Sequence, residues 1–330
     1  MYVTGLLSSH KKNVINCFQV HFWLHGGVSA KVSASKPLIM GHEASGIIDQ
    51  VGTAVSDLKV GDRVAIEPGY PCRRCDTCKR GQYNLCPDMK FAACPPNDHG
   101  TLTRLFKLPE DFCYKLPDTV SLEEAVLLEP LAVAVHAAKI ANLRHGDTVV
   151  ILGSGTIGLL CAAVAKASGA KKVVAVDILE SKLQFAREWN HSETFKADIG
   201  DSPNSNADRL VKDNALGQGA DVVVEASGAA SSISIGVHAL RPGGSFVQVG
   251  MIGPNIDFPM QQVAEKELHV YGCFRYSAGD FEAALQMLAT NQIDVKDLIS
   301  VILPFDQATE AWERTRKGHG IKNLIRGPES

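Results

Sequence analysis

The chain lacks a strong excess of either charge. Its 33 Lys and Arg residues nearly balance its 36 Asp and Glu residues, which leaves a formal net charge of −3. A protein that holds nucleic acid or an anionic membrane surface through its overall electrostatic field usually carries a pronounced basic excess. The balance gives no support to either kind of partner, and we expect neither.

The sequence also lacks a long apolar run. The longest stretch without Asp, Glu, Lys, Arg or His extends from Thr148 to Ala165, and glycines interrupt it at Gly153, Gly155 and Gly158. Such a stretch fits a strand, a turn and the start of a helix better than a membrane span. The N-terminal segment M-Y-V-T-G-L-L-S-S-H-K-K contains no apolar core of the length that a signal peptide needs. These observations predict an intracellular, cytoplasmic protein.

Internal repeats and low-complexity tracts are missing as well. The composition, with 45% apolar and 21% charged residues, is that of an ordinary globular protein. A length of 330 residues makes two domains the first expectation and one large domain the alternative. Residues 40–120 are rich in Gly, Pro and short β-branched runs, which is typical of an all-β module.

The pattern changes near residue 130. Apolar strand segments at 148–152, 172–177 and 221–226 alternate with helical patterns, and this alternation predicts a parallel sheet with helices on both faces. We expect further strands over 245–250 and 268–272, and helices over 131–143, 180–189, 281–290 and 307–317.

Four of the nine cysteines lie close together in a C-x2-C-x2-C-x7-C pattern, at Cys72, Cys75, Cys78 and Cys86. In a reducing compartment this spacing favours a metal site over a set of disulfides. Four thiolates around one zinc leave no open coordination position, so the predicted role is structural. Chance reduced cysteines are the alternative. The scattered cysteines are expected to be small buried apolar residues: Cys94, Cys113, Cys161 and Cys273.

The segment G-S-G-T-I-G fits a G-x-G-x-x-G pattern that follows an apolar strand and opens a helix. Gly153 permits the tight turn, Gly155 lets a pyrophosphate approach the backbone, and Gly158 lets helix and strand pack closely. Asp177 ends the next strand, where its carboxylate would accept hydrogen bonds from the adenosine ribose and repel a 2′-phosphate. NAD is therefore favoured over NADP. Lys182 either flanks the ribose or is a solvated helix lysine, and an ordinary turn that binds nothing is the alternative for the whole motif.

Two further segments carry metal-ligating residue types. Gly41-His42-Glu43 follows the apolar run 37–40, and Glu129-Pro130 closes a helical stretch where we expect a domain junction. Imidazole and carboxylate are ligands for first-row metals, and active clefts favour domain junctions. A single His-Glu pair is weak support, so the combination carries the hypothesis.

Together, G-H-E-x-x-G, the four-cysteine loop, L-x-E-P-L-A-V-A-V-H, G-x-G-x-x-G and G-C-F-R-Y resemble the zinc-dependent medium-chain polyol dehydrogenases over about residues 20–326. F-A-A-C-P-P-N-D-H-G-T-L and T-R-K-G-H-G-I-K are similar to the xylitol dehydrogenase branch, beside sorbitol dehydrogenase. The resemblance implies an α/β fold in two parts. A GroES-like β-barrel catalytic domain would span 1–130, a Rossmann NAD-binding domain 131–272, and a return to the catalytic domain 273–330. It also implies a homo-oligomer, a tetramer or a dimer.

The same resemblance implies the chemistry, which is oxidation of a polyol, such as xylitol to D-xylulose, by hydride transfer to NAD. A catalytic zinc would be held by a cysteine, His42 and Glu43, with Glu129 near or on the metal, and His21 would relay the released proton. Arg275 and Tyr276 would contact substrate. The cofactor contacts implied by the family are Ile157, Asp177, Val249, Gly250, Met251, Cys273, Phe274 and Arg275.

The chain departs from the family pattern before V-H-F-W. The family has G-I-C-G-S-D, where this chain has V-I-N-C-F-Q over 14–19. Alignment without a gap places the ligand cysteine on Asn16 and the relay serine on Phe18, and it leaves Cys17 one position out of register. Because a shift of one residue can turn a side chain to the opposite face, Cys17 would complete the site only if the loop is rebuilt.

This departure sustains an alternative, a catalytically impaired NAD(H)-binding relative without a complete catalytic zinc site. A zinc-independent quinone reductase on the same fold is a third possibility, but His42, Glu43 and the four-cysteine loop argue against it. The segment M-Y-V-T-G-L-L-S-S-H-K-K lacks strand alternation, so we expect residues 1–19 not to replace the missing barrel strands and an edge of the sheet to be exposed. One hypothesis is that they are a translated intron end, with the resemblance resuming at Val20.

Overall fold

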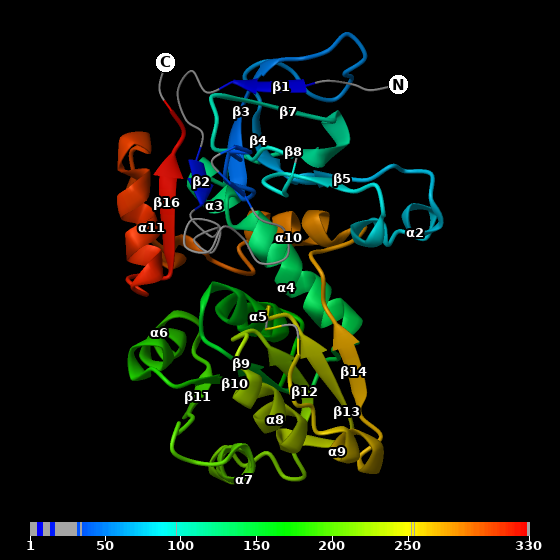
Figure 1. The fold of residues 1–330 in the computed structure, drawn as a ribbon, viewed down its shortest axis with the longest axis vertical. Helices are drawn as coiled ribbons and strands as arrows, with labels where there is room; N and C mark the ends of the chain where they lie inside the picture. The colour runs from blue at the N-terminus through cyan, green and yellow to red at the C-terminus, as the bar shows by residue number, and fades with distance from the viewer. Residues whose placement is uncertain are drawn as a thin grey trace. The chain divides into compact units, whose positions relative to one another are not determined.

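A computed structural model describes residues 5–8, 14–16, 32–33, 35–96, 98–251, 253 and 255–328. The chain divides into two compact units (Figure 1). Unit 1 contains the residues up to Glu129 and those from Ser277 onward, and unit 2 runs from Pro130 to Tyr276. The chain therefore leaves unit 1 once and returns to it.

Unit 2 is built on a six-stranded sheet in which all neighbouring strands run parallel, in the order β11-β10-β9-β12-β13-β14. The sequence T-V-V-I-L of β9 is buried throughout, as expected for a parallel strand that is covered on both faces. The strands are β9 (Thr148–Leu152), β10 (Lys172–Asp177), β11 (Glu193–Lys196), β12 (Ala220–Glu225), β13 (Leu240–Gln248) and β14 (His269–Gly272).

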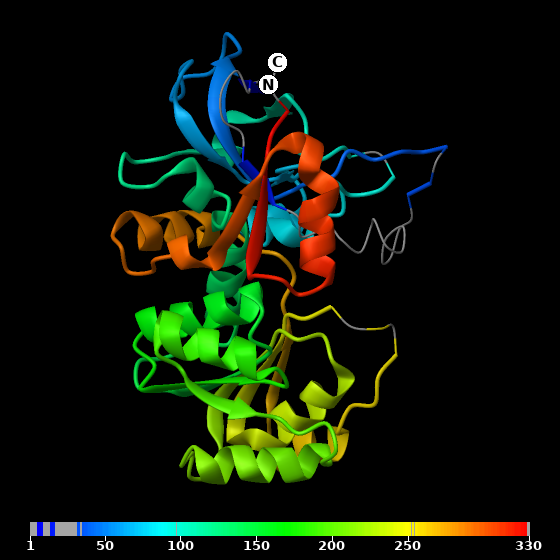
Figure 2. The same ribbon diagram turned by 90° about the vertical axis from the view of Figure 1, so that its left-hand side faces the viewer.

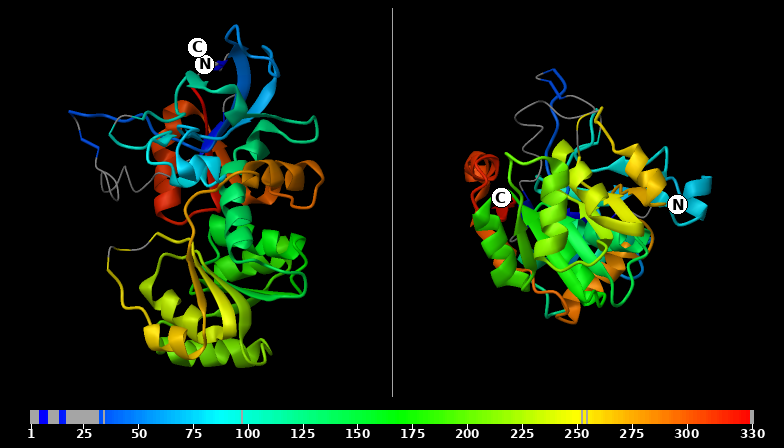
Figure 3. Two further views of the ribbon diagram at one scale, coloured as in Figure 1. Left: turned by 90° about the vertical axis from the view of Figure 1, so that its right-hand side faces the viewer. Right: turned by 90° about the horizontal axis from the view of Figure 1, so that it is seen from below.

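Helices cover this sheet on both faces (Figure 3). The order of strands reverses between β9 and β12, and right-handed crossovers then place the connecting helices on opposite faces. Val150, Val223 and Phe246 lie at the centre of the resulting core with essentially no exposed surface. The helices are α4 (Leu128–Ile140), α5 (Thr156–Ala167), α6 (Glu180–Asn190), α7 (Pro203–Asp213), α8 (Ala230–Ala239) and α9 (Met260–Glu265).

Unit 1 contains an eight-stranded and mostly antiparallel sheet, in the order β15-β16-β2-β3-β1-β7, with β4 joining β3 to β8. Ile48, Val64 and Leu108 form the centre of its apolar core. The strands are β1 (Gly5–Ser8), β2 (Val14–Asn16), β3 (Ala44–Gln50), β4 (Arg63–Ile66), β7 (Leu105–Leu108), β8 (Cys113–Lys115), β15 (Ile299–Leu303) and β16 (Lys322–Arg326).

Smaller elements complete unit 1. A two-stranded sheet, β5 (Gly69–Tyr70) and β6 (Lys90–Phe91), flanks the four-cysteine loop, which contains α2 (Asp76–Lys79) and the 3-10 turn η1 (Tyr83–Leu85). Among the described residues, unit 1 also contains the α-helices α3 (Leu122–Ala125), α10 (Asp280–Ala289) and α11 (Ala308–Arg316), and the 3-10 turns η2 (Glu110–Phe112), η3 (Lys296–Leu298) and η4 (Phe305–Gln307). Figure 2 shows α11 beside β16, against which it packs.

The expectation for residues 1–19 is wrong at two places. Strand β1 pairs with β3 and β7, and β2 pairs with β3 and β16, so both short segments join the sheet. The expected exposed edge is therefore covered along the parts of β3 that these strands reach. The physical reason is that pairing with a preformed neighbouring strand overrides weak local alternation.

The helix near residue 130 also differs from the expectation. Glu129-Pro130 lies in the first turn of α4 and does not close a helix. Proline is tolerated there because the first-turn N–H groups have no partner within the helix.

None of the helices in the described part of the chain has the length and apolar character of a membrane span.

Candidate metal centres and cofactor site

A glycine turn carries His42 and Glu43 to the start of β3. Gly41 has a φ of +95°, in the left-handed region that glycine adopts without steric cost. The N–H of Thr101 donates to the carbonyl of Gly41 at 2.8 Å and ties the turn to a second loop. The turn thus fixes the backbone on which the two metal-ligating side chains stand.

His42, Glu43 and Glu129 come together in unit 1. Each offers one ligand atom, and the three atoms lie within 4.8 Å of one another. Glu43 and Glu129 are 2% and 6% exposed. Two buried carboxylates beside an imidazole form an oxygen- and nitrogen-rich donor set that fits a divalent transition metal such as zinc.

A buried ion pair borders this cluster. The Nζ atom of Lys322, on β16, lies 2.5 Å from Oε2 of Glu43, and both side chains are 2% exposed. A buried charge is costly without a partner, so each side chain compensates the other. No sequence motif indicated a role for Lys322. The available signal was a lysine at the start of the strand K-N-L-I-R, which contains the apolar pair Leu324 and Ile325.

The four cysteines also come together. The ligand atoms of Cys72, Cys75, Cys78 and Cys86 lie within 4.8 Å of one another. The sulfur of Cys78 is 3.3 Å from that of Cys75 and 4.0 Å from that of Cys72. Four sulfurs at about 2.3 Å from one zinc stand about 3.8 Å apart at the corners of a tetrahedron. The donor set and its spacing therefore fit a structural zinc.

A buried carboxylate anchors the four-cysteine loop to the sheet. Glu67, just after β4, accepts hydrogen bonds from the hydroxyl of Tyr83 in η1 at 2.5 Å and from that of Tyr114 on β8 at 2.7 Å. Burial raises the pKa of Glu67 to about 7, although the two tyrosine hydrogen bonds oppose that shift. No sequence motif indicated Glu67, because its partners are distant in the chain.

The glycine-rich turn in unit 2 has the features that a dinucleotide needs. Gly153 has a φ of +97°, and a Cβ atom on Gly158 would stand 1.8 Å from the carbonyl oxygen of Gly153. Gly155 caps the N-terminus of α5, and a Cβ atom there would meet only open space. The first N–H groups of α5 are thus approachable by a phosphate, which the positive end of the helix favours. Ile157 lies in the first turn of the same helix.

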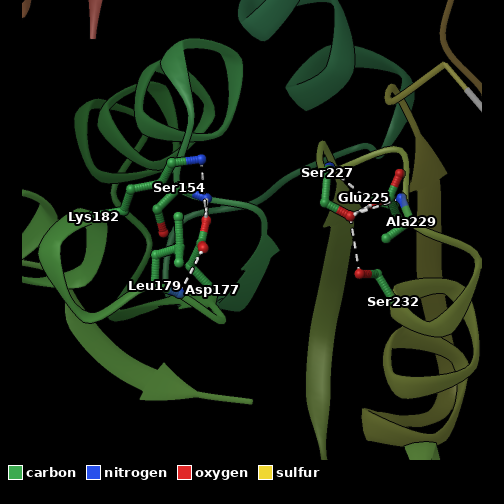
Figure 4. A network of polar contacts seen from close by, with 8 residues as sticks. All are labelled: Ser154, Asp177, Leu179, Lys182, Glu225, Ser227, Ala229 and Ser232. Atoms are coloured by element: carbon green, nitrogen blue, oxygen red, sulfur yellow. Dashed lines mark hydrogen bonds and ion pairs between the residues drawn. The ribbon is translucent and has the colours of Figure 1, made fainter. Parts of the chain in front are cut away.

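Asp177 lies at the carboxyl end of β10, beside the glycine-rich turn (Figure 4). Its carboxylate accepts hydrogen bonds from the N–H groups of Ser154 at 2.9 Å and Leu179 at 3.0 Å. Lys182 places its ammonium group 3.9 Å from the same carboxylate. In the described part of the chain, the buried hydroxyl of Ser154 has no hydrogen-bond partner. This corner of unit 2 fits a nucleotide ribose and phosphate.

The other expected cofactor residues follow β13 and β14. The N–H groups of Val249 and Gly250 donate to the carbonyl of Glu225, and that of Cys273 donates to the carbonyl of Gln248 at 2.8 Å. Met251 and Phe274 are exposed. The two expected substrate residues, Arg275 and Tyr276, have different surroundings. The guanidinium of Arg275 stands 4.6 Å above the ring centroid of Phe274, whereas Tyr276 is buried. His21 and Cys17 lie outside the described residues.

Two family models match the chain. The model for the alcohol dehydrogenase GroES-like domain matches residues 13–118, and the model for zinc-binding dehydrogenases matches residues 156–290. Among curated proteins, D-xylulose reductase A of Aspergillus oryzae is 50% identical over 308 residues, covering 93% of this chain and 85% of the relative. D-xylulose reductase A of Aspergillus niger is 49% identical over 311 residues, covering 94% and 86%.

Solved structures agree in fold. An oxidoreductase of unknown specificity from Escherichia coli superposes with a TM-score of 0.89 and 31% identity, over 98% of this chain and 91% of that chain. Galactitol-1-phosphate dehydrogenase from the same species has a TM-score of 0.86 and 26% identity, over 98% and 92%.

These comparisons confirm the predicted family and the predicted fold class, a GroES-like domain with a Rossmann-like parallel sheet. They also confirm the prediction of an oxidoreductase that depends on zinc and NAD, and they do not favour the catalytically impaired alternative. The relatives match along almost the whole chain, so the assignment rests on both units together. The chain belongs to the zinc-binding dehydrogenases, among the medium-chain polyol dehydrogenases.

Proposed function

We propose that this protein oxidises xylitol to D-xylulose, and the reverse, with NAD as the hydride acceptor. The observation that carries the proposal is the cluster of His42 with the buried Glu43 and Glu129, in a chain about half identical to D-xylulose reductases. Sorbitol and arabinitol are the competing substrates, because they differ from xylitol by one carbon or one hydroxyl configuration.

His42, Glu43 and Glu129 are the proposed ligands of the catalytic zinc, with Cys17 as a candidate for the remaining position. Bound zinc would act as a Lewis acid that lowers the pKa of the alcohol hydroxyl. Glu43 and Glu129 would supply negative charge to the metal, and Lys322 would hold one oxygen of Glu43 in place. Cys72, Cys75, Cys78 and Cys86 are the proposed ligands of the structural zinc.

In unit 2, the turn at Gly153, Gly155 and Gly158 would receive the pyrophosphate of NAD, and Asp177 would accept hydrogen bonds from the adenosine ribose. Bound NAD would take up the hydride at its nicotinamide ring. Lys182 would flank the ribose. The remaining proposed cofactor contacts are Ile157, Val249, Gly250, Met251, Cys273, Phe274 and Arg275. His21 would relay the proton, and Arg275 and Tyr276 would contact the polyol.

The proposal extends to the organisation of the molecule. Residues 1–130 with 273–330 would form the catalytic domain, and 131–272 the NAD-binding domain, in line with the two compact units. We further propose a homo-oligomer, a tetramer or a dimer, and a cytoplasmic location, because a cluster of four thiols needs a reducing compartment.

The test is an NAD-coupled assay of xylitol, sorbitol and arabinitol on purified protein whose zinc content has been measured. The proposal expects about two zinc ions per chain, one at each donor set, and the highest kcat/KM for xylitol. A folded sample with about one zinc that binds NADH but oxidises none of the three polyols would support the impaired alternative.

A further inference from the structure

Strand β12 ends in a carboxylate that neither the motifs nor the family resemblance assigned to the site. Glu225 is the last residue of D-V-V-V-E and has no exposed surface. Carboxylates are almost never fully buried without partners, because removal from water is costly. The partners of Glu225 therefore indicate what the residue holds together.

Both carboxylate oxygens of Glu225 accept hydrogen bonds, and Figure 4 shows the contact between Glu225 and Ser227. Oε1 accepts from the N–H of Ser227 at 2.8 Å, from the N–H of Gly228 at 3.0 Å and from the hydroxyl of Ser227. Oε2 accepts from Nε2 of Gln248 at 2.6 Å. Among the described residues every one of these donors is neutral. The carboxylate of Glu225 is thus the common acceptor of these hydrogen bonds.

The main chain of Glu225 extends the same connection. Its carbonyl accepts from the N–H groups of Val249 at 2.9 Å and Gly250 at 2.8 Å. Glu225 thus joins the loop after β12, which carries Ser227 and Gly228, to the loop after β13. Side chain and backbone together fasten two loops that are separated by a helix in the sequence.

The joined loops fit closely against each other and against the glycine-rich turn. A Cβ atom on Gly250 would stand 2.5 Å from the nitrogen of Gly228, and a Cβ atom on Gly153 would stand 2.8 Å from the nitrogen of Ser227. Because both contacts are too close to admit even one more carbon atom, a shift of the Ser227–Gly228 backbone must also move Gly153 or Gly250. The position of these loops therefore depends on the Glu225 carboxylate.

We propose that Glu225 is a positioning residue for the nicotinamide half of the cofactor, an inference that rests on the proposed NAD binding. In doubly wound sheets the ligand binds outside the carboxyl ends of the strands, where the strand order reverses, here between β9 and β12. Asp177 ends β10, on the adenosine side of that point, and Glu225 ends β12, on the other side. Loss of the carboxylate should therefore disturb the side away from adenosine more than the adenosine side.

The test compares NADH and AMP binding in the full-length protein. Oε2 of Glu225 also lies 3.3 Å from the N–H of Gly228, and in Glu225→Gln an NH2 group in its place would face the donors of Gly228 and Gln248. We expect the Kd for NADH, measured by fluorescence titration, to rise at least about tenfold, as a misplaced buried polar group implies. The Ki for AMP as a competitor of NADH should change less than about twofold, because AMP occupies only the adenosine half.

Asp221 provides a matched control at the opposite end of the same strand. Its carboxylate also links neighbouring strands, through the N–H of Thr148 at 2.7 Å and Nε of Arg241 at 2.6 Å. Asp221→Asn should lower the melting temperature and leave both affinities unchanged. If Glu225→Gln does not fold, Gln248→Ala, which removes one donor, carries the test with a smaller change in the same direction.

Three results would overturn the inference: unchanged NADH affinity in the folded variants, an equal loss of NADH and AMP, or an equal effect of Asp221→Asn. Failure of the proposed function would look different, because the wild-type protein itself would then not bind NADH.

Discussion

At the residue scale, the buried pair Lys322–Glu43 couples the C-terminal part of unit 1 to the candidate catalytic metal centre. Removing one partner of a buried ion pair leaves an uncompensated charge, which costs far more than the pair itself contributes. A bound divalent cation would take over part of the compensation of Glu43. The consequence of losing Lys322 should therefore depend on metal.

We predict that Lys322→Met lowers the free energy of unfolding of the metal-free protein by about 3 kcal/mol and that of the zinc-loaded protein by less. Urea denaturation with and without a chelator measures both values. Lys296→Met is the matched control, because the Lys296 side chain is 63% exposed and lies 3.8 Å from Glu124. An equal effect with and without metal would show that Glu43 is not at the metal.

Glu67 leads to a pH prediction at the same scale. Its pKa is raised from 4.5 to about 7, so between these pH values the folded state holds a proton that the unfolded state has released. Its contribution to stability is therefore full below about pH 4.5 and is lost as pH rises to about 7, by about 3 kcal/mol in total.

The variant Glu67→Gln should lack this loss, so its unfolding free energy relative to wild type should rise by about 3 kcal/mol between pH 4.5 and pH 7. Urea unfolding curves across that range measure the difference. Glu310→Gln, on the exposed face of α11, is the control: its unfolding free energy should change with pH as that of the wild type does. If the unfolding free energy of Glu67→Gln changed with pH as that of the wild type does, the pKa of Glu67 would not be raised.

The sequence found the residues of both metal clusters, because residue type and spacing carry the signal for metal ligands. It could not find Lys322 or Glu67, because a buried charge is recognised only by partners that the fold brings to it. Glu129 was singled out as a candidate ligand, but its place at the start of α4 was missed, since Pro130 indicates a helix boundary without saying on which side the helix lies.

At the scale of elements, the best-predicted strands are those with continuous apolar runs. Strands β9 and β10 coincide with the expected ranges 148–152 and 172–177, because a strand buried on both faces has little polar sequence. Strands β11, β15 and β16 were not predicted. β11 is an edge strand with the mixed sequence E-T-F-K, and β16 pairs with β2 and β15, so its partners come from distant parts of the chain.

The four-cysteine loop should depend on its metal as one element. We predict that Cys78→Ser loses about one zinc per chain and becomes sensitive to proteolysis within 72–86, because the loop has little apolar content to fold by itself. Metal analysis and limited proteolysis measure the two effects. Cys94→Ser, outside the cluster, should keep the full zinc content, and an unchanged zinc content in Cys78→Ser would exclude the loop as a metal site.

The turn before α5 separates packing from cofactor binding. A Cβ atom at Gly158 would collide with the carbonyl of Gly153, whereas one at Gly155 would meet open space. We predict that Gly158→Ala lowers the unfolding free energy by about 1–3 kcal/mol. Gly155→Ala should keep the stability but weaken NADH binding, by placing a methyl group where the phosphate approaches. Thermal unfolding and NADH titration measure stability and cofactor binding in both variants. A loss of stability in Gly155→Ala with unchanged stability in Gly158→Ala would contradict the geometry.

At the scale of the whole molecule, the two proposed chemical functions belong to different units. The metal cluster lies in unit 1, whose sheet contains strands from both ends of the chain, and the glycine-rich turn lies in unit 2, which is a continuous segment. The sequence indicated this division because strand–helix alternation begins near residue 130. It could not show that residues 5–8 and 14–16 pair into the sheet, since their partners are β3, β7 and β16.

In the proposed mechanism, His42, Glu43 and Glu129 hold the metal that activates the alcohol. The most direct measurement is the rate of NAD-coupled xylitol oxidation as a function of bound zinc, in the wild-type protein and in His42→Ala. We expect the rate to fall in proportion to zinc removal and to return when zinc is restored. In His42→Ala we expect about a thousandfold loss of rate or more with NADH binding retained. Undiminished oxidation of xylitol by a folded, metal-stripped protein would contradict this mechanism.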